Sequence, residues 1–274
     1  MKLQTIVDIK PSGWKIGYED KILMLGSCFS DEIGEQMKQR NLQVTCNPFG
    51  TLYNPLSIAN AINLQILKSS NLQIVNYDGL WHSMAHHGSF SRPTKEGTEA
   101  AVMQSVEKMQ RALAEATVVI VTFGTAWVYE MGGQIVGNCH KLPADTFTRR
   151  RLTVEEIVAA WQPIITRYPD KHWLFTVSPI RHIKDGLHEN QLSKATLLMA
   201  VEALTGASYF PSYEILLDEL RDYRFYADDL VHPSSLAVNY IWERFVETFC
   251  TNGTRNQMQI EHKQWKFEHH RPLH

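Results

Sequence analysis

The chain has 274 residues, of which 44% are hydrophobic and 20% are charged, a balance typical of a globular protein with a sizeable core. Its 27 lysines and arginines nearly cancel its 29 aspartates and glutamates, so the formal net charge is −2 and the basic excess of a general nucleic-acid binder is missing. No run approaches the roughly 18–20 apolar residues of a membrane helix, and Asp8 interrupts the apolar stretch that a secretory signal needs, so we expect a cytoplasmic protein with no membrane partner.

Short apolar runs alternate with longer helical stretches along the chain. The clearest run is TVVIVT at residues 117–122, which is β-branched or apolar throughout. In chain order, strands are predicted at residues 21–25, 42–45, 117–122, 172–177 and 207–210. Helices are predicted at residues 31–40, 55–67, 98–116, 153–167, 190–204, 212–221 and 234–250, with a hairpin at 127–136 and a polar, histidine-containing loop at 80–93.

This alternation predicts an α/β fold, a three-layer α/β/α sandwich with a parallel sheet of about five strands. Residues 1–250 are expected to form one domain, and residues 251–274 a polar C-terminal tail on its surface. In such a sheet the ligand site lies beyond the carboxyl ends of the strands. The segments that follow the strands at residues 26–28, 47–50, 124–127 and 178–182 are polar or contain glycine, which nominates them as the site.

Two nucleophile-type side chains, Ser27 and Cys28, follow the first predicted strand in the stretch LGSCFS. The start of the next helix, with Ser30 as its expected N-cap, offers free N–H groups and the positive end of a dipole. A thiol or hydroxyl at that place is easier to deprotonate, and an oxyanion formed there finds donors. We therefore expect a lowered pKa for Cys28.

The stretch DDLVHP at residues 228–233 carries an aspartate and a histidine three residues apart. On a turn, Asp229 can accept a hydrogen bond from one nitrogen of His232 and leave the other nitrogen for a nucleophile. That is the orienter, base and nucleophile logic of acyl transfer. Asp229, rather than its neighbour Asp228, is expected to be the partner of His232, because neighbouring side chains point apart.

Several short stretches together resemble a known family. They read GSCFS at residues 26–30, NPFGTLYNP at 47–55, HHGSFS at 86–91, NCHK at 138–141, SPIRH at 178–182, SKA at 193–195 and DLVHP at 229–233. With them the chain resembles the bacterial GSCFA-domain family and, more distantly, the SGNH/GDSL hydrolases. The resemblance implies a hydrolase that acts on an ester or other acyl bond of a small-molecule or carbohydrate-linked substrate, with no cofactor and no metal.

The identity of the nucleophile stays open in the sequence. SGNH enzymes read G-D-S in the first block, so alignment on Gly26 places Ser27 at the aspartate and Cys28 at the nucleophile. By register we expect Cys28 to attack, with His232 as the base and Asp229 as its orienter. The alternatives are a turn that presents Ser27, an acyltransferase that uses Cys28, and an inactive binding module that has kept only the fold.

The resemblance also nominates residues that bind the oxyanion and the substrate. Gly50 matches the glycine donor of the second block, whereas the asparagine donor of the third block is absent from GTAW at residues 124–127. Asn138 is the expected substitute, and Asn54 a weaker one. Among the other polar residues, His86 and His87 are expected to line the cleft, and His140, Arg181 and His182 to contact an anionic part of the substrate.

The histidine and cysteine spacings favour neither a metal site nor disulfide bonds. His82 and His86 stand four residues apart, but Gly88 would end a helix there, so no metal site is expected. The four cysteines lie far apart and form no C-x-x-C pair, so free thiols are expected.

Overall fold

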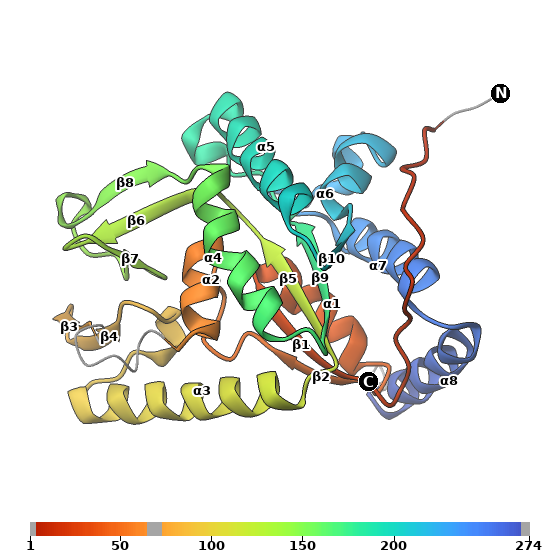
Figure 1. The fold of residues 1–274 in the computed structure, drawn as a ribbon, viewed down its shortest axis with the longest axis horizontal. Coiled ribbons are helices and arrows are strands. Elements are labelled where there is room, and N and C mark those ends of the chain that lie inside the picture. The colour runs from red at the N-terminus through yellow and green to blue at the C-terminus, as the bar shows by residue number, and fades with distance from the viewer. Residues whose placement is uncertain (1–3, 65–72, 270–274) are drawn as a thin grey trace, which may run out of the picture.

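The computed structural model describes residues 4–64 and 73–269 (Figure 1). Its centre is a five-stranded sheet in the order β10-β9-β5-β1-β2, and each pair of neighbouring strands is parallel. The strands are β1 (Lys21–Gly26), β2 (Gln43–Cys46), β5 (Val118–Phe123), β9 (His172–Val177) and β10 (Ala207–Phe210). All five coincide with the predicted runs to within one residue at either end, which confirms the predicted parallel sheet.

Both faces of this sheet are buried, because successive side chains of a strand point to opposite sides. Leu23, Val119 and Phe175 contribute to one hydrophobic core, and Met24 and Ile120 to the other. Four helices cover the first face: α2 (Pro55–Ile62), α3 (Lys95–Glu115), α4 (Val154–Arg167) and α5 (Leu187–Ala203) (Figure 1). Two helices, α1 (Cys28–Lys38) and α7 (Ser235–Phe249), cover the second face. The short helix α6 (Ser212–Glu214) and a π-helical turn at Ile215–Glu219 lie between β10 and α7 in the chain. Helices on both faces make the three-layer α/β/α sandwich.

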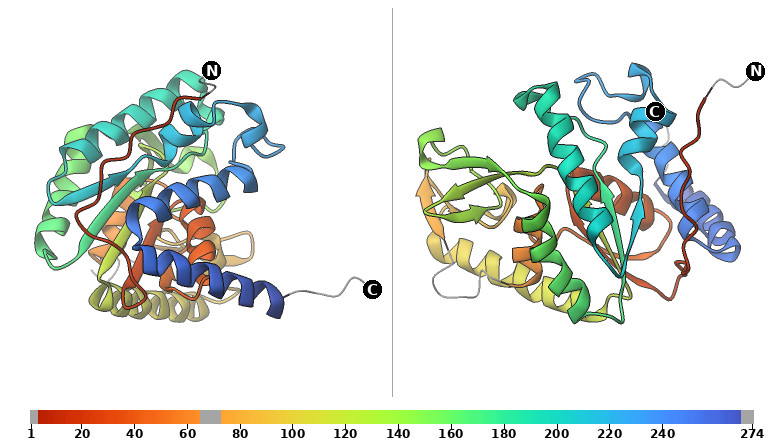
Figure 2. Two further views of the ribbon diagram at one scale, coloured as in Figure 1. Left: turned by 90° about the vertical axis from the view of Figure 1, so that its right-hand side faces the viewer. Right: turned by 45° about the horizontal axis from the view of Figure 1, so that its top comes forward.

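Two small antiparallel sheets lie outside the central one. The hairpin predicted at residues 127–136 is present, with Gly132 and Gly133 both at positive φ in its turn, where a side chain would be strained. A third strand completes this sheet, which stands apart from the central sheet (Figure 2, right). The strands of the two small sheets are β3 (Ile74–Tyr77) with β4 (Leu80–Ser83), and β6 (Trp127–Met131) with β7 (Gln134–Val136) and β8 (Thr148–Arg151).

The prediction of a plain loop at residues 80–93 is therefore wrong at its start. Residues 80–83 pair with residues 74–77 as a hairpin around Asp78 and Gly79, and both of these residues adopt positive φ. A 3₁₀ turn, Gly88–Phe90, follows. The strand escaped prediction because LWHS is short and half polar, with no apolar alternation to reveal it.

Helix α1 begins three residues earlier than predicted. Ser27, not Ser30, is the N-cap residue, and Cys28 is the first residue of the helix. Ser30 is buried, and its hydroxyl lies 2.7 Å from that of Thr122 and donates to the carbonyl of Leu25. The serine expected to cap the helix therefore fastens it to the sheet instead.

The segment expected to be a polar tail forms a helix, α8 (Asn252–Glu268). Thr251 caps it by accepting the N–H of Thr254, and Met258, one turn later, is buried against the core on the α7 side of the sheet. Only one turn of α8 packs in this way, so no continuous apolar stripe marked it in the sequence. The predicted helix at residues 55–67 ends at Ile62, and its residues 65–67 lie outside the described residues.

Within residues 4–64 and 73–269, no helix combines the length and the apolar character that crossing a membrane requires.

Candidate active site

A cavity of about 510 Å³ opens at the carboxyl edge of the sheet, beyond β1 and β5. The chain leaves β1 toward α1 on one face and leaves β5 toward α4 on the other, so the cavity lies at the point where the winding of the sheet reverses. Such switch points are the usual ligand sites of open α/β sheets. Of the predicted residues, the cavity is lined by Ser27, Cys28, Asn54, Asn138, Arg181, His182 and His232.

Gly26 makes the turn into α1 as tight as it is. Its φ is 132°, and a Cβ placed on it would lie 2.1 Å from the carbonyl oxygen of Thr122 in β5. That same oxygen accepts the N–H of Ser27 at 3.3 Å. A side chain at position 26 would therefore push the turn away from β5 and misplace residues 27 and 28.

Ser27 occupies the N-cap position without capping the helix. Its side chain makes no capping hydrogen bond, and its Oγ is buried with no hydrogen-bond partner in the described part of the chain. Buried hydroxyls are nearly always paired, so an unpaired one on the wall of a cavity marks a place for a ligand.

Cys28 stands beside it with its side chain only partly buried. Burial raises the pKa of its thiol, and the carboxylates of Asp31 and Glu32 raise it further, while the N–H groups of Cys28 and Phe29 act in the opposite direction. The expected lowering of this pKa is therefore wrong. The helix N-terminus does favour the thiolate, but desolvation outweighs it.

The predicted pair of Asp229 and His232 is present in the turn before α7. Oδ2 of Asp229 lies 2.6 Å from Nδ1 of His232, and its Oδ1 accepts the N–H groups of Val231 and His232. These three contacts, led by the N–H of His232, lower the pKa of Asp229 to about 2. Both side chains are about half exposed. The carboxylate of Asp229 thus fixes both the backbone of the turn and the orientation of the imidazole ring.

Arg181 lines the cavity and also holds this turn in place. Its N–H donates to the carbonyl of Val231, and its Nη1 donates to that of Leu230 at 2.9 Å. Its guanidinium also lies over the ring of Tyr226, 5.3 Å from the centroid. The predicted contact of Arg181 with an anionic part of the substrate stays a prediction, since Arg181 also lines the cavity.

His182 lies next to it, on the wall of the cavity. Its Nε2 is buried and has no hydrogen-bond partner among the described residues. Burial, helped by the positive charge of Lys194, lowers the pKa of His182 to about 4, so its ring is neutral at pH 7.

Lys194 is a residue near the cavity for which the sequence predicted no role, although the stretch SKA at residues 193–195 is part of the resemblance to the family. It is fully buried, and its Nζ donates to the carbonyls of Gly124 and Ser178 at 2.8 and 2.7 Å. These carbonyls follow β5 and β9, so the ammonium ties the two strand ends together beneath the cavity. Burial lowers its pKa to about 7. A lysine among the apolar residues of a helix was the available signal.

The model of one protein family, described as the GSCFA family, matches residues 21–245. The chain belongs to the GSCFA family. The matched range starts with β1 and ends within α7, so it contains the central sheet and every residue that lines the cavity. A search of curated proteins finds no match to the chain.

The GSCFA motif lies at the cavity, but the predicted oxyanion donor Gly50 does not. Its N–H donates to the carbonyl of Asn47 at 2.7 Å within a turn, and it is not part of the cavity lining. Asn54 does line the cavity, but its Oδ1 accepts the N–H of Ser57 and its Nδ2 donates to the hydroxyl of Ser57 at the start of α2. Asn138 lines the cavity and accepts the N–H of His140 with its Oδ1, which leaves its Nδ2 for a ligand.

Three predicted histidines lie outside the cavity lining. His86 is fully buried between the hydroxyls of Ser83 and Ser105. Nε2 of His140 lies 2.9 Å from the carbonyl of Ser83, and His87 caps the turn that follows it. The prediction that His86 and His87 line the cleft is wrong, because His86 is fully buried and the N–H of His87 donates to the carbonyl of Phe49, outside the cavity lining. The described residues contain no group of three or more His, Cys, Asp or Glu that could hold a metal ion.

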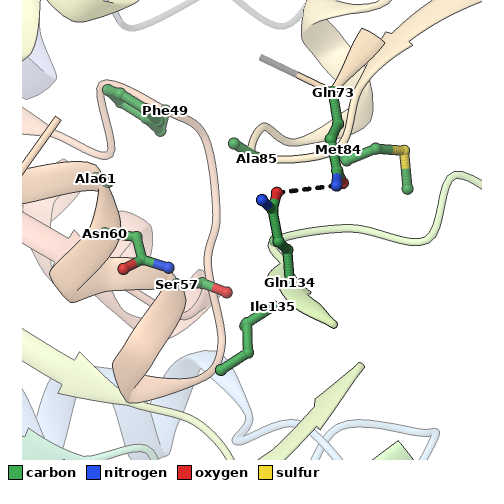
Figure 3. A pocket seen from close by; sticks show the side chains of 10 residues that line it. Phe49, Ser57, Asn60, Ala61, Gln73, Met84, Ala85, Gln134 and Ile135 are labelled. Carbon is green, nitrogen blue, oxygen red and sulfur yellow. Dashed lines mark hydrogen bonds between the residues drawn. The ribbon is translucent and has the colours of Figure 1, made fainter. Parts of the chain in front are cut away.

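A second cavity, of about 230 Å³, lies between α2, the β3–β4 hairpin and β7 (Figure 3). Gln73 crosses it to donate to Oε1 of Gln134 at 2.9 Å, and Phe49, Met84 and Ala85 form apolar parts of its wall. Among the described residues, no charged side chain lines it. Its described lining lacks the thiol, imidazole and charged side chains that line the larger cavity.

Acidification is expected to destabilise the protein through its buried histidines. Burial lowers the pKa of His86 to about 3, so between its ordinary pKa of about 6.5 and pH 3 the unfolded chain binds the proton more readily. Stability present above pH 6.5 is therefore lost as the pH falls, by up to about 1.4 kcal/mol per pH unit for this one group. Urea unfolding at pH 7, 6, 5 and 4.5 measures this slope. His86→Gln should flatten it and His87→Gln should leave it unchanged; equal slopes in all three proteins would contradict the assignment.

The four free thiols are expected to react in two groups. Burial raises the pKa of Cys46 to about 11 and that of Cys250 to about 12, whereas Cys28 and Cys139 are more exposed. Iodoacetamide at pH 8 should therefore modify Cys28 and Cys139 first, and faster as the pH rises. Peptide mass spectrometry over time measures the order, which early labelling of Cys250 would overturn.

Proposed function

We propose that the protein is an SGNH-type hydrolase that cleaves an ester or other acyl bond, with Cys28 as nucleophile, His232 as general base and Asp229 as its orienter. One observation carries this proposal. The partly exposed thiol of Cys28 and the imidazole of His232 line the same cavity, and Nδ1 of that imidazole lies 2.6 Å from Oδ2 of Asp229. Nucleophile, base and orienter are the parts that acyl transfer requires.

In this reaction the sulfur of Cys28 attacks the acyl carbon while Nε2 of His232 takes the thiol proton. A thiol with a raised pKa is neutral at pH 7, so deprotonation accompanies attack instead of preceding it. Collapse of the tetrahedral intermediate breaks the bond to the leaving alcohol, which receives the proton from His232. Water then attacks the thioester with the same base, which releases the acid and restores the thiol.

The negative charge that develops on the acyl oxygen needs donors. The N–H of Cys28, the unpaired hydroxyl of Ser27 and Nδ2 of Asn138 are the candidates, because all three residues line the cavity and Gly50 does not. Oriented donors of this kind are the largest single contribution in many acyl-transfer enzymes. Ser27 then supports the reaction as a donor.

Ser27 as the nucleophile is the alternative mechanism. The exposure of the two side chains argues against attack by Ser27, since its Oγ is buried while Cys28 is partly exposed to a substrate. Alignment of Gly26 with the glycine of the G-D-S block also places Cys28, and not Ser27, at the position of the nucleophile.

The substrate class follows from the size of the cavity and the chemistry of its wall. A volume of about 510 Å³ suits a small molecule or one or two sugar units that carry an acyl group. The proposed chemistry uses protein side chains alone and needs no cofactor. An alcohol in place of water in the second step would make the protein an acyltransferase.

A non-catalytic binding module is the second candidate. It is favoured by the raised pKa of Cys28 and by the engagement of the Gly50 N–H within its own turn. Such a module would bind the acylated compound at the same cavity without cleaving it.

Hydrolysis of 4-nitrophenyl acetate and of a simple aryl thioester tests the proposal. The protein should release product above the rate of a Cys28→Ala control, with a defined KM. Addition of glycerol distinguishes hydrolysis from transfer, because a transferase would form the glycerol ester in place of acetate. Equal rates with and without Cys28, combined with saturable binding of the ester, would leave the binding module as the function.

A further inference from the structure

The end of the cavity away from Cys28 is walled by the small β6–β8 sheet and the turn after β9. Trp127 and Tyr129 come from β6, Arg149 from β8, and Lys184 and Asp185 from the turn at residues 183–185. None of these residues serves the acyl-transfer step proposed above. We call Trp127, Arg149 and Lys184 the donor wall, because each presents only hydrogen-bond donors.

Arg149 is held rigidly in this wall. Its guanidinium lies 4.2 Å from the ring centroid of Trp127 and 5.3 Å from that of Tyr129, and its Nη2 lies 2.6 Å from Oδ1 of Asp185. Aromatic stacking and one ion pair fix the plane of a guanidinium. One of its five N–H donors is used by Asp185, and a planar fork remains for an oxygen ligand.

Trp127 adds an independent sign of a ligand. Its Nε1 is buried and finds no hydrogen-bond partner within residues 4–64 and 73–269, although it belongs to a residue of the cavity wall. An indole N–H can only donate, and leaving it unpaired costs free energy that a ligand oxygen would recover.

The charges of this end of the cavity point the same way. Lys184 has no ion-pair partner among the described residues, and Asp185 is the only carboxylate of the lining. Arg181, the remaining cation, is engaged with the loop of His232. Hydrogen-bond donors and positive charges thus dominate this end of the cavity, which favours a ligand that accepts hydrogen bonds and carries negative charge.

We propose that the donor wall binds an anionic group, a carboxylate or a phosphate, on the part of the substrate remote from the acyl bond. This deepens the proposed function, on which it rests for the identity of the ligand as a substrate. The sequence nominated His140, Arg181 and His182 for anion recognition, and to these we add Trp127, Arg149 and Lys184.

Matched esters test the proposal. Phenyl acetate, 4-carboxyphenyl acetate and 4-(phosphonooxy)phenyl acetate differ in the charged group opposite the ester. The ratio of kcat/KM for an anionic ester to that for phenyl acetate should fall roughly tenfold or more in Arg149→Gln, and by a smaller factor in Trp127→Phe, which removes only the N–H donor. The loss should appear mainly in KM. Comparing each variant with the parent cancels the intrinsic reactivity of the esters.

Arg150→Gln is the matched control. Its guanidinium pairs with Glu130 and Glu156, each at 2.8 Å, and lies outside the cavity lining. It should keep the ratio of the parent protein. A drop for the carboxylate alone, or for the phosphate alone, identifies the group that is bound; unchanged ratios in both Arg149→Gln and Trp127→Phe would overturn the proposal.

A binding measurement separates this inference from the hydrolase proposal. Calorimetry with 4-methoxybenzoate and 4-methoxyphenyl phosphate, against uncharged anisole, needs no turnover. Anion binding that Arg149→Gln abolishes, in a protein that cleaves no ester, would refute the hydrolase and retain the donor wall. Turnover of phenyl acetate without Arg149-dependent binding of either anion would retain the hydrolase and refute the donor wall.

Discussion

Replacement of Cys28 by alanine is expected to lower kcat/KM for a 4-nitrophenyl ester by about 10³-fold or more, since removal of the nucleophile abolishes the covalent route. Cys28→Ser should lose nearly as much, because a hydroxyl is far less acidic than a thiol and its proton transfer to His232 is correspondingly harder. Steady-state rates with active-site concentrations and a thermal melt for each variant provide the measurement.

The neighbouring Ser27→Ala variant is the control for that result. As a donor to the oxyanion, Ser27 should account for about 10²-fold, which is the usual loss when one such donor is removed. The reverse pattern, with turnover abolished in Ser27→Ala and retained in Cys28→Ala, would assign the attack to the serine and contradict the mechanism.

Loss of the base is the second large effect. His232→Ala should reduce kcat by about 10³-fold, because the thiol, neutral at pH 7 with its raised pKa, then has no group to accept its proton. Asp229→Asn keeps an oxygen for the N–H groups of Val231 and His232 but weakens the hold on Nδ1. We expect about 10²-fold from it, less than in a buried triad because the pair is half exposed.

Asp228 offers a matched neighbour for this comparison. It is exposed and adjacent to Asp229, and of these two aspartates Asp229 is the one that is hydrogen-bonded to His232. Asp228→Asn should therefore stay within a few-fold of the parent. Equal losses in the two asparagine variants would mean that the loop as a whole, and not the Asp229–His232 pair, supports the reaction.

The central sheet could be predicted from the sequence because its signal is local. Strands buried on both faces, such as residues 118–123 and 172–177, read as continuous apolar runs. The strands of the small sheets carry no such run: residues 148–151 read TRRR, and they become a strand only by pairing with β6, about 20 residues earlier in the chain. Helix α8 likewise buries only one turn of a polar sequence.

In the candidate site, too, the features set by neighbours in the chain could be predicted, and those set by distant contacts could not. The turn of Ser27 and Cys28 and the Asp229–His232 pair depend on neighbours in the chain, so their spacing was enough to predict them. The place of Gly50 depends on which side of a loop faces the cavity, and that loop packs against His87 and Phe90, about 40 residues later in the chain. Lys194 could not be assigned a role, because the two carbonyls it binds come from strands 70 and 16 residues away in sequence.

Trapping of the covalent intermediate tests the central claim most directly. The protein is mixed with an excess of a slowly hydrolysed aryl ester, quenched in acid and measured by intact mass and peptide mass spectrometry. The account predicts one added acyl group, located on the sulfur of Cys28, that forms in the parent and in Ser27→Ala and is absent from Cys28→Ala. An acyl group on Ser27, or turnover that proceeds with no acylated protein at any time, would contradict it.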